Sequence, residues 1–422
     1  MSESIIMNES IIEQLKAAAK AKQFLQQFSP EAKAALLNNM ATALVEQEAV
    51  ILEANKIDLD RMDDGDPKKD RLLLNGDRLK ALSDSVRQIA GLIDPTDQLL
   101  LKKTLPNGLE IEKITVPLGV VGVIYESRPN VTIDVAALCI QSGNVCVLRG
   151  GSDAQYTNEA LVHVIHGVLD DSGVSRDIVQ LLPVDRKYVS ELLEATKYVD
   201  IIIPRGSQSL IDFVREHAKV PVIETGAGVC HTYVDKTADL DMAASIVANA
   251  KISRPSVCNS LDTVLVDMDV APVFLAKLAP YFKNAAVEVF ADPVAFGILE
   301  QEGFSNLVMA QEPDFGREFL DLKCSVKVVN GLDEALDHIE KYSSKHSECI
   351  VSSNELHVER FLNVVDAAAV YVNASTRFTD GGEFGLGAEI GISTQKLHAR
   401  GPFALEKLVT EKWIVRGNGQ IR

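Results

Sequence analysis

The sequence contains no Cys-x-x-Cys pair among its six cysteines, which lie at positions 139, 146, 230, 258, 324 and 349. Disulfide frameworks and zinc ribbons depend on closely spaced cysteines, so the spacing argues against both and favours a reducing compartment. We therefore expect no metal site. Apolar runs of about 18 residues, the length that crosses a bilayer, are missing too. The first nine residues are acidic and lack the order of a secretory signal, so we expect a cytoplasmic protein.

Basic runs are also absent, and the net charge is −18. Nucleic acids and anionic membranes attract basic surfaces, so we expect neither as a partner. A small anionic substrate needs only a local basic site and stays compatible with this charge. The G-x-G-x-x-G run of the usual dinucleotide-binding turn is missing as well. With 422 residues, 46% of them apolar, the chain is long enough for two or three globular domains.

Residues 9–60 and 71–91 have the periodicity of helices, and the acidic residues 58–70 between them suggest an exposed connection. Residues 99–116 alternate around Pro106-Asn107-Gly108, and Asn-Gly between alternating apolar residues predicts a hairpin. A long hairpin needs another surface to cover it, so we interpret it as an arm for packing or oligomerisation. Residues 412–416 predict a final strand.

From residue 119 onwards, short apolar runs alternate with helical segments, which predicts an α/β fold with mostly parallel sheets. We expect a first series of strands at 119–125, 145–149, 178–182, 198–204, 220–224 and 231–234. A second series, in a second α/β domain, is expected at 263–266, 287–290, 307–310, 326–329, 348–352 and 368–372. Helices are expected at 133–141, 154–170, 186–195, 209–217, 332–342 and 355–365.

Cys258 is the candidate nucleophile, near the junction of the two series. Thiolate rather than thiol attacks carbonyls, and two features would favour the anion. Arg254 lies four residues before it, and we expect a helix to start just after Pro255-Ser256, where the helix dipole stabilises negative charge. A buried structural cysteine is the alternative interpretation.

Three loops follow predicted strands, at residues 125–130, 149–152 and 204–207. Ligands of open parallel sheets bind at the carboxyl ends of strands, where glycines admit a ligand and Arg149 or Arg205 could meet a phosphate or ribose. Ordinary βα turns use the same residues. Glu224 closes another predicted strand and could be a general base, a cofactor contact or an ordinary strand-end acid.

The densest polar stretch, residues 371–387, suits a substrate that bears a carboxylate, because it combines an arginine with small donors. For its glycine-rich half, a flexible surface loop is the competing interpretation. Residues 393–402 bring Lys396, His398 and Arg400 together, and this group could hold an anion.

Residues 116–132, 254–259, 371–387 and 393–402 are very similar to the motifs of the γ-glutamyl phosphate reductases, also called glutamate-5-semialdehyde dehydrogenases. The resemblance runs from about residue 9 to residue 422. This family belongs to the aldehyde dehydrogenase superfamily, and its members use NADPH to reduce L-glutamyl 5-phosphate to L-glutamate 5-semialdehyde, the second step of proline biosynthesis. The resemblance implies an NADP-dependent phosphorylating aldehyde dehydrogenase.

The resemblance also implies an aldehyde-dehydrogenase-like architecture with two Rossmann-like domains and a β-hairpin oligomerisation arm. The cofactor domain would comprise residues 1–97 and 117–225, the catalytic domain 226–400, and the arm 98–116 and 411–422. A homo-oligomer, dimer or tetramer, is expected. No kinase domain precedes the reductase in this sequence, so the chain resembles the monofunctional form. Association with a separate glutamate 5-kinase is a further interaction that the resemblance suggests.

By the same resemblance, Cys258 attacks the acyl phosphate and Asn130 donates to the oxyanion. Cofactor contacts are expected at Arg149, Ser152, Gly206, Ser207, Glu224 and Gly226. Ser152 stands where NAD-preferring members often have an acid, which leaves room for the 2′-phosphate of NADP. Charge, rather than a motif, suggests Arg377 for the substrate's α-carboxylate and Arg254 or Lys396 for the phosphate. The full set of expected substrate contacts is Arg254, Asn373, Ser375, Thr376, Arg377 and Lys396.

The nearest alternative is a hydrolytic, NAD(P)-dependent semialdehyde dehydrogenase in which Glu224 activates water. A reductase whose thioester must survive until hydride arrives has no use for such a base. We therefore predict that Glu224 is a remnant or a cofactor contact. A catalytically silent binding protein is the alternative from another class, although it would not need Cys258.

Overall fold

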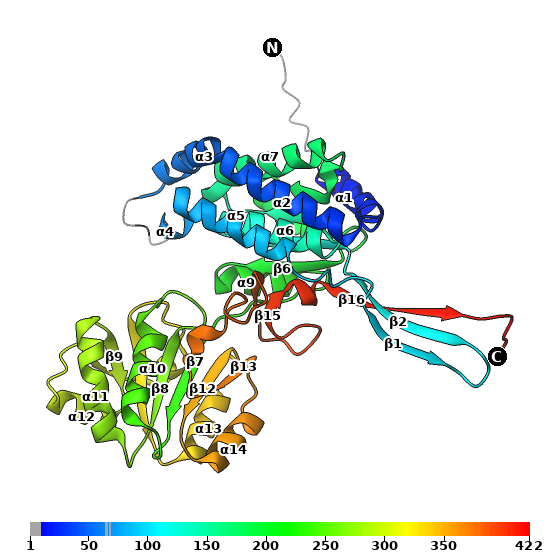
Figure 1. The fold of residues 1–422 in the computed structure, drawn as a ribbon. Coiled ribbons are helices and arrows are strands. Elements are labelled where there is room, and N and C mark those ends of the chain that lie inside the picture. Colours follow the sequence, from blue (N-terminus) through cyan, green and yellow to red (C-terminus); the bar gives the residue numbers. More distant parts are fainter. Residues whose placement is uncertain (1–9, 64–65, 67–68) are drawn as a thin grey trace. The chain divides into compact units, whose positions relative to one another are not determined.

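The structure is a computed structural model and describes residues 10–63, 66 and 69–422. It divides into two compact units, which we describe separately (Figure 1). Unit 1 consists of Met1–Thr225, Gly385–Gly391 and Phe403–Arg422, and unit 2 of Gly226–Phe384 and Ile392–Pro402. Within the described residues, every helix is too short or too polar to cross a membrane.

Unit 1 is built on a four-stranded parallel sheet with the order β5-β4-β3-β6. Its strands are β3 (Val120–Tyr125), β4 (Val145–Arg149), β5 (Val179–Leu181) and β6 (Ile201–Arg205). All of β3 is buried, as expected for a strand in the middle of a parallel sheet. The chain adds β4 and β5 on one side of β3 and then returns to place β6 on the other. The loops after β3 and β6 therefore flank the point where the strand order reverses, the usual ligand position in such sheets.

Helices α6 (Asn130–Gln141) and α7 (Gln155–Asp171) pack on this sheet (Figure 1). A further layer of α2 (Pro30–Glu46), α3 (Glu48–Asp60) and α5 (Gly76–Ala90) covers them. The other helices of unit 1 are α1 (Ile12–Leu25), α4 (Lys69–Leu72), α8 (Arg186–Leu193) and α9 (Gln208–His217). The expectation that residues 58–70 form an exposed connection is wrong at its start, because residues 58–60 complete α3, and residues 64, 65, 67 and 68 lie outside the described residues. Asp58 is buried, and its carboxylate accepts hydrogen bonds from the N–H and the hydroxyl of Thr157 near the start of α7.

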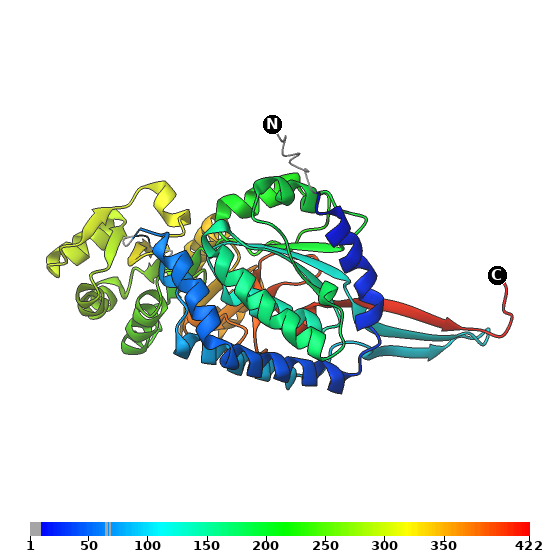
Figure 2. The same ribbon diagram turned by 90° about the horizontal axis from the view of Figure 1, so that it is seen from above.

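A separate antiparallel sheet confirms the predicted hairpin and final strand. It has the order β1-β2-β16, and its strands are β1 (Leu99–Thr104), β2 (Glu110–Pro117) and β16 (Val409–Arg416). Figures 1 and 2 show these strands reaching beyond the helices of unit 1. Of the Asn-Gly pair in the turn, Gly108 alone takes a positive φ, +85°. Its N–H donates to the carbonyl of Leu105, which closes the turn.

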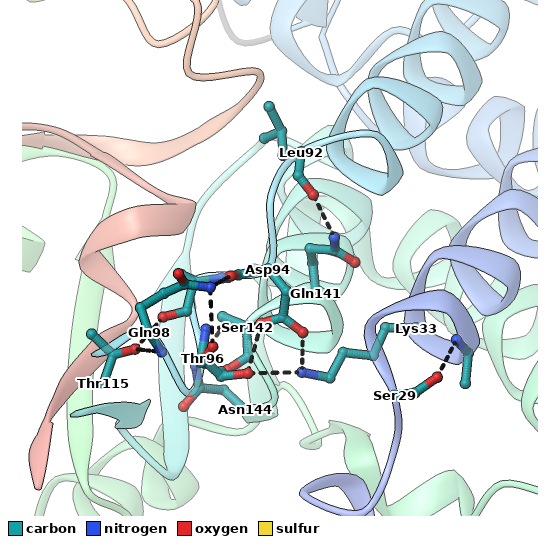
Figure 3. Close-up of polar contacts among 12 residues, drawn as sticks. Ser29, Lys33, Leu92, Asp94, Thr96, Gln98, Thr115, Gln141, Ser142 and Asn144 are labelled. Atoms are coloured by element: carbon teal, nitrogen blue, oxygen red, sulfur yellow. Dashed lines mark hydrogen bonds and ion pairs between the residues drawn. The ribbon is translucent and has the colours of Figure 1, made fainter. Parts of the chain in front are cut away.

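The base of this sheet is fixed by a buried polar cluster (Figure 3). Lys33 Nζ, on α2, lies 2.7 Å from Asp94 Oδ2, and the two side chains are only 4% and 6% exposed. Asp94 Oδ1 also accepts from the N–H and the hydroxyl of Thr96, so the segment between α5 and β1 is held in place. Asn144, between α6 and β4, donates to the carbonyl of Leu408 at 2.7 Å, just before β16 begins. The cluster therefore anchors the starts of β1 and β16, at the base of the antiparallel sheet, to the helices of unit 1.

Unit 2 contains a seven-stranded parallel sheet with the order β10-β9-β11-β8-β7-β12-β13. Its strands are β7 (Cys230–Val234), β8 (Leu261–Asp267), β9 (Glu288–Ala291), β10 (Leu307–Met309), β11 (Lys323–Val329), β12 (Ser347–Val351) and β13 (Ala369–Val372). Its helices are α10 (Leu240–Ile252), α11 (Ala271–Asn284), α12 (Pro293–Gln301), α13 (Leu332–Tyr342) and α14 (Glu355–Val364). The remaining strands, β14 (Glu389–Ser393) and β15 (Gly401–Ala404), pair as a two-stranded sheet.

Both faces of the seven-stranded sheet are buried, and β8 shows why. Val264 and Val266 belong to a hydrophobic core that includes residues of α10, α11 and α12. Leu265, between them, belongs to a second core with residues of α13 and α14. Successive side chains of a strand point to opposite faces, so a strand covered on both sides needs a continuous apolar run. Runs of this kind are what predicted the strands from sequence.

Two expectations about the strands are wrong. Residues 231–234 were expected in the first series, whereas β7 belongs to the second sheet. Residues 220–224 form no strand, and their ladder contact with the first sheet is a single bridge between Val222 and Ile202. Pro221, which has no N–H to donate, explains why regular pairing does not extend there.

Candidate active site

Cys258 lies in a series of turns between the end of α10 and the start of β8, at the amino edge of the seven-stranded sheet. The expectation that a helix starts after Pro255-Ser256 is wrong, so a helix dipole cannot be what favours a thiolate here. Exposure separates Cys258 from the other cysteines. Its side chain is partly exposed, whereas the remaining five cysteines are buried, and none of the six forms a disulfide.

The carbonyl group of Cys258 packs tightly against the chain that leads into β7. Cys230 Sγ donates to this carbonyl oxygen at a distance of 3.3 Å. A Cβ atom on Gly228 would lie 1.5 Å from the same oxygen, so only glycine fits there. Burial raises the pKa of Cys230 well above its ordinary value, which keeps it a thiol and leaves Cys258 as the nucleophile candidate.

The structure brings Thr376 and Arg377, two of the expected substrate contacts, to the Cys258 loop. Thr376 Oγ1 donates to the carbonyl of Asn259 at 2.8 Å. The Arg377 guanidinium donates to Asn259 Oδ1 and, through Nε, to Ser253 Oγ at 3.3 Å. The pKa of Arg377 is lowered by burial and by the positive charge of Arg254, an exposed residue of the same loop. The sequence motifs did not single out Asn259, although it stands next to Cys258, the candidate nucleophile.

Asn373, expected beside these residues, lies at the opposite edge of the sheet. Its φ is +53°, and its side chain bonds both the N–H and the carbonyl of Ser352, just past the end of β12. The chain reverses at this residue and returns across the sheet, so that Ser375 and the two residues after it reach the amino edge. Ser375 is buried, and its hydroxyl accepts from the N–H of Arg377.

Lys396 belongs to a cluster of cations around one carboxylate. Asp366 contacts Lys396 Nζ at 2.8 Å, Arg400 Nη1 at 2.7 Å and Lys345 Nζ at 3.3 Å. Hydrogen bonds from Lys396 and Arg400 hold the pKa of Asp366 well below its usual range. Lys396 and Arg400 therefore come together, as expected, and Asp366 neutralises part of their charge.

Asn130 is the first residue of α6 and follows the loop after β3. Its Nδ2 donates to Asp134 Oδ2, one helical turn on, at a distance of 3.1 Å. Burial raises the pKa of Asp134 to about 6. The ionised carboxylate accepts the amide hydrogen bond more strongly than the protonated acid does, so Asp134 is suited to orient Asn130.

The loops after β4 and β6 carry four of the expected cofactor residues, Arg149, Ser152, Gly206 and Ser207. Ser207 N, at the start of α9, donates to Glu126 Oε2 at 2.9 Å. A Cβ atom on Gly206 would lie 2.6 Å from the same carboxylate oxygen. Arg149 donates from Nη2 to the carbonyl of Val184. Its Nε, like that of Arg205, is buried and has no hydrogen-bond partner among the described residues. Two guanidinium groups at one edge of the sheet are thus able to bind a further acceptor.

A pocket of about 480 Å³ lies at the carboxyl ends of β4 and β5. It is lined by Gly150, Gln155, Asn158, Glu159, Leu181, Leu182, Pro183, Val184, Asp185 and Tyr188. Gly150 belongs to the expected loop 149–152, and a Cβ there would lie 2.2 Å from Asn158 Nδ2. Ser152 is exposed, whereas the next residue, Asp153, accepts a hydrogen bond from the hydroxyl of Ser127.

Glu224 and Gly226 follow the irregular segment after α9. Glu224 Oε2 lies 3.6 Å from Arg215 Nη1 of α9, and its side chain is 22% exposed. Gly226 has room for a Cβ atom, which would meet Thr394 Oγ1 at an ordinary 3.5 Å. Within residues 10–63, 66 and 69–422, no group of three or more histidine, cysteine or acidic side chains is arranged to hold a metal ion.

Comparison with known proteins identifies close relatives. Residues 5–299 match the model of the aldehyde dehydrogenase family. The gamma-glutamyl phosphate reductase of Pelodictyon phaeoclathratiforme is 52% identical over 417 residues, which cover 99% of this chain and 100% of that protein. The protein of the same name from Chlorobaculum parvum is 51% identical over 419 residues, 98% of this chain and 99% of the relative. The crystal structure of gamma-glutamyl phosphate reductase from Thermotoga maritima matches with a TM-score of 0.93 at 40% identity, covering 98% of this chain and 100% of that one.

Proposed function

This chain belongs to the aldehyde dehydrogenase family and, within it, to the gamma-glutamyl phosphate reductases. From that membership we propose that it uses NADPH to reduce L-glutamyl 5-phosphate to L-glutamate 5-semialdehyde with release of phosphate. It is an oxidoreductase that acts on a small molecule with a nicotinamide cofactor, and the proposed reaction is the second step of proline biosynthesis from glutamate. The observation that carries the proposal is the setting of Cys258, the partly exposed cysteine beside Arg377 in a chain that matches these reductases over its whole length.

The Cys258 thiolate attacks the acyl carbon of the substrate, and the phosphate leaves with the electrons of its bond to that carbon. The product of this step is a thioester on Cys258. When bound, the nicotinamide cofactor supplies a hydride to the same carbon. The carbon–sulfur bond then breaks, which releases the aldehyde and restores the thiolate. The charges of Arg254 and Arg377 favour the anionic sulfur and the anionic substrate alike.

Asn130 is the proposed side-chain donor to the oxyanion that forms during this attack, together with the backbone N–H of Cys258. Its hydrogen bond to Asp134 fixes the direction of the amide. Removing one oxyanion donor typically raises the barrier by about 2.7–4 kcal/mol. Asn130 therefore acts on the rate of the chemical step more than on substrate binding.

The residues of unit 1 fit an anionic dinucleotide. The unpartnered Nε atoms of Arg149 and Arg205 lie at the ends of β4 and β6, and a pocket lies beside Gly150. We propose that Arg149, Ser152, Gly206 and Ser207 hold the cofactor, and that Ser152 leaves space for the 2′-phosphate of NADPH. Glu224 and Gly226 complete the proposed contacts. The pairing of Glu224 with Arg215 supports a role as a cofactor contact or remnant rather than as a base.

For the substrate, we propose that Arg377 binds the α-carboxylate with Ser375 and Thr376. Arg254 or Lys396 would meet the phosphate. Asn373 is less suited to bind substrate, because its Oδ1 and Nδ2 atoms already form hydrogen bonds with the backbone of Ser352.

We also propose the division of labour expected from the family. Residues 1–97 and 117–225 would bind the cofactor, 226–400 would carry the chemistry, and 98–116 with 411–422 would join subunits in a dimer or tetramer. Association with glutamate 5-kinase would shield a labile acyl phosphate from water. A cytoplasmic location agrees with this biosynthetic role.

The test is whether oxidation of glutamate semialdehyde by NADP⁺ requires inorganic phosphate. The proposed reaction predicts that the wild-type protein strictly requires phosphate for turnover and that Cys258→Ser has no turnover. The alternative, a hydrolytic semialdehyde dehydrogenase, predicts turnover without phosphate that depends on Glu224. Turnover that needs no phosphate and that Glu224→Gln abolishes would show that the protein is a hydrolytic semialdehyde dehydrogenase and not a reductase.

A further inference from the structure

Asn259, the residue after the nucleophile, is 4% exposed and uses both ends of its side chain. Its Nδ2 donates to the carbonyl of Arg377 at 3.2 Å and to that of Thr379 at 2.9 Å. Its Oδ1 accepts from the Arg377 guanidinium, and its own carbonyl accepts from Thr376 Oγ1. Asn259 therefore joins the Cys258 loop to a segment 118 residues further along the chain.

That segment is itself held firmly. Thr379 is fully buried, and its hydroxyl bonds Ser347 Oγ and the hydroxyl of Tyr371, each at 2.7 Å. Ser347, the first residue of β12, bonds His346 Nδ1 at 2.8 Å. The partner of Asn259 is thus part of the edge of the sheet rather than a loose loop.

The opposite side of the Cys258 peptide is also held. Cys230 Sγ donates to the Cys258 carbonyl, and the same sulfur lies 3.9 Å from His346 Nδ1. Together with Ser347 and Thr379, these contacts close a ring that leads back to Asn259. Contacts on both sides of the Cys258–Asn259 peptide hold the Cα atom of Cys258, from which the thiol projects.

We infer that Asn259 is a positioning residue that couples the substrate-binding segment Ser375–Arg377 to the nucleophile. The inference rests on the proposed function, which assigns the α-carboxylate to this segment. The guanidinium that would bind the carboxylate also bonds Asn259 Oδ1, so the place of the substrate and the place of the sulfur are set by one side chain. Losing this link would let the two drift apart, and a shift of about 1 Å can lower a rate about 100-fold.

The experiment compares full-length wild-type protein with Asn259→Ala and Asn259→Asp. Asn306→Ala is the matched control, because Asn306 also donates from its side chain to one backbone carbonyl, that of Ala286, at an exposed site of unit 2. The measurements are kcat and KM for phosphate-dependent semialdehyde oxidation, and the rate of Cys258 alkylation by iodoacetamide as a function of pH. Melting temperature and NADPH binding report whether each variant is folded.

For Asn259→Ala we expect kcat to fall about 100-fold, a larger change than that in KM, with slower alkylation of Cys258. For Asn259→Asp, the added negative charge should move the pH midpoint of alkylation upwards. A folded Asn259→Ala protein whose kcat and alkylation rate match those of Asn306→Ala overturns the inference. A wild-type protein with no phosphate-dependent turnover instead overturns the proposed function.

If Asn259→Ala does not fold, a pair of variants at Thr379 decides, because the Thr379 carbonyl accepts from Asn259 and Thr379 lies outside the proposed substrate contacts. Thr379→Val keeps the shape of the side chain but loses the hydroxyl that bonds Ser347 and Tyr371, whereas Thr379→Ser keeps the hydroxyl. We expect Thr379→Ser to retain kcat within about threefold and Thr379→Val to lose about tenfold. Equal kcat values in the two variants would contradict the coupling.

Discussion

At the scale of the single residue, Glu126 holds a carboxylate against the amino end of α9, where we expect the cofactor's phosphates. Its Oε2 accepts from Ser207 N, and its negative charge also acts on Arg149. A diphosphate binding there would have to replace this carboxylate and tolerate its charge. We therefore predict that Glu126 weakens binding of the cofactor.

Replacing Glu126 by glutamine should tighten NADPH binding. Because the substitution removes one negative charge from the phosphate position, we expect the Kd to fall about fivefold at low ionic strength, less at high salt. Fluorescence titration with NADPH measures it. Glu194→Gln, which alters an exposed carboxylate paired with Lys219, is the control and should leave the Kd unchanged. A weaker affinity in Glu126→Gln would show that the carboxylate helps to hold the cofactor.

We expect Asp134 to link activity to pH through Asn130, the proposed donor to the oxyanion. Its raised pKa of about 6 means that the folded protein favours the protonated acid, so its contribution to stability is present at low pH and is lost as the pH rises through about 6. Activity should change in the opposite sense, because only the ionised carboxylate orients the Asn130 amide strongly.

We therefore expect wild-type kcat to rise between pH 5 and pH 7 with a midpoint near 6, and Asp134→Asn to lack this step. The pH profile of kcat, measured with both proteins in the same buffers, tests it. An unchanged midpoint in Asp134→Asn would assign the step to another group.

At the scale of the element, the Lys33–Asp94 pair decides how α2 holds the base of β1. A buried ion pair contributes little net stability as a pair, yet breaking it leaves a charge buried without a partner. The pair in Figure 3 is of this kind, since both side chains are almost fully buried.

Lys33→Met should destabilise the protein by about 3–5 kcal/mol and lower the first melting transition by roughly 10 °C. The double variant Lys33→Met/Asp94→Leu should recover part of this loss, because no charge is left alone. Calorimetry of the full-length protein measures the transitions. Lys80→Met, which removes an exposed partner of Asp84, should change the melting temperature by less than about 2 °C. A single variant that melts like Lys80→Met would mean that water reaches Asp94.

At this scale the positions of the strands were predictable from the sequence, but two details of their pairing were not. Buried parallel strands need continuous apolar runs, so their positions are visible in the sequence. Residues 220–224 have such a run, but Pro221 interrupts the donors, and one bridge remains. Likewise, the apolar run at 231–234 predicted a strand correctly. The sheet that this strand joins depends on its partners β8 and β12, which lie further along the chain.

At the scale of the whole molecule, the antiparallel sheet is the proposed subunit contact. Trp413 and Val415, alternate residues on one face of β16, are 54% and 55% exposed. Leu99 and Leu100 add exposed apolar surface on β1. Exposed apolar residues gathered on a long, narrow sheet are typical of an interaction surface.

Trp413→Asp should weaken subunit association, because it replaces exposed apolar surface of the arm by a charge. Sedimentation velocity at micromolar concentration should show a smaller particle than the wild type. Lys412→Gln, a neighbour whose side chain points to the other face of β16, should sediment like the wild type. An unchanged mass for Trp413→Asp would remove this face from the interface.

The sequence by itself determined the class of fold and the hairpin, and it singled out Cys258 and the loops of the proposed nucleotide site, because these depend on local periodicity and short motifs. Tertiary structure alone decided which polar residues meet. Asn373 and Arg377 are four positions apart, yet a chain reversal sends one to Ser352 and the other to Asn259, at opposite edges of the sheet. These contacts join residues 21 and 118 positions apart, so they are set by the packing of whole strands, and no local pattern encodes them.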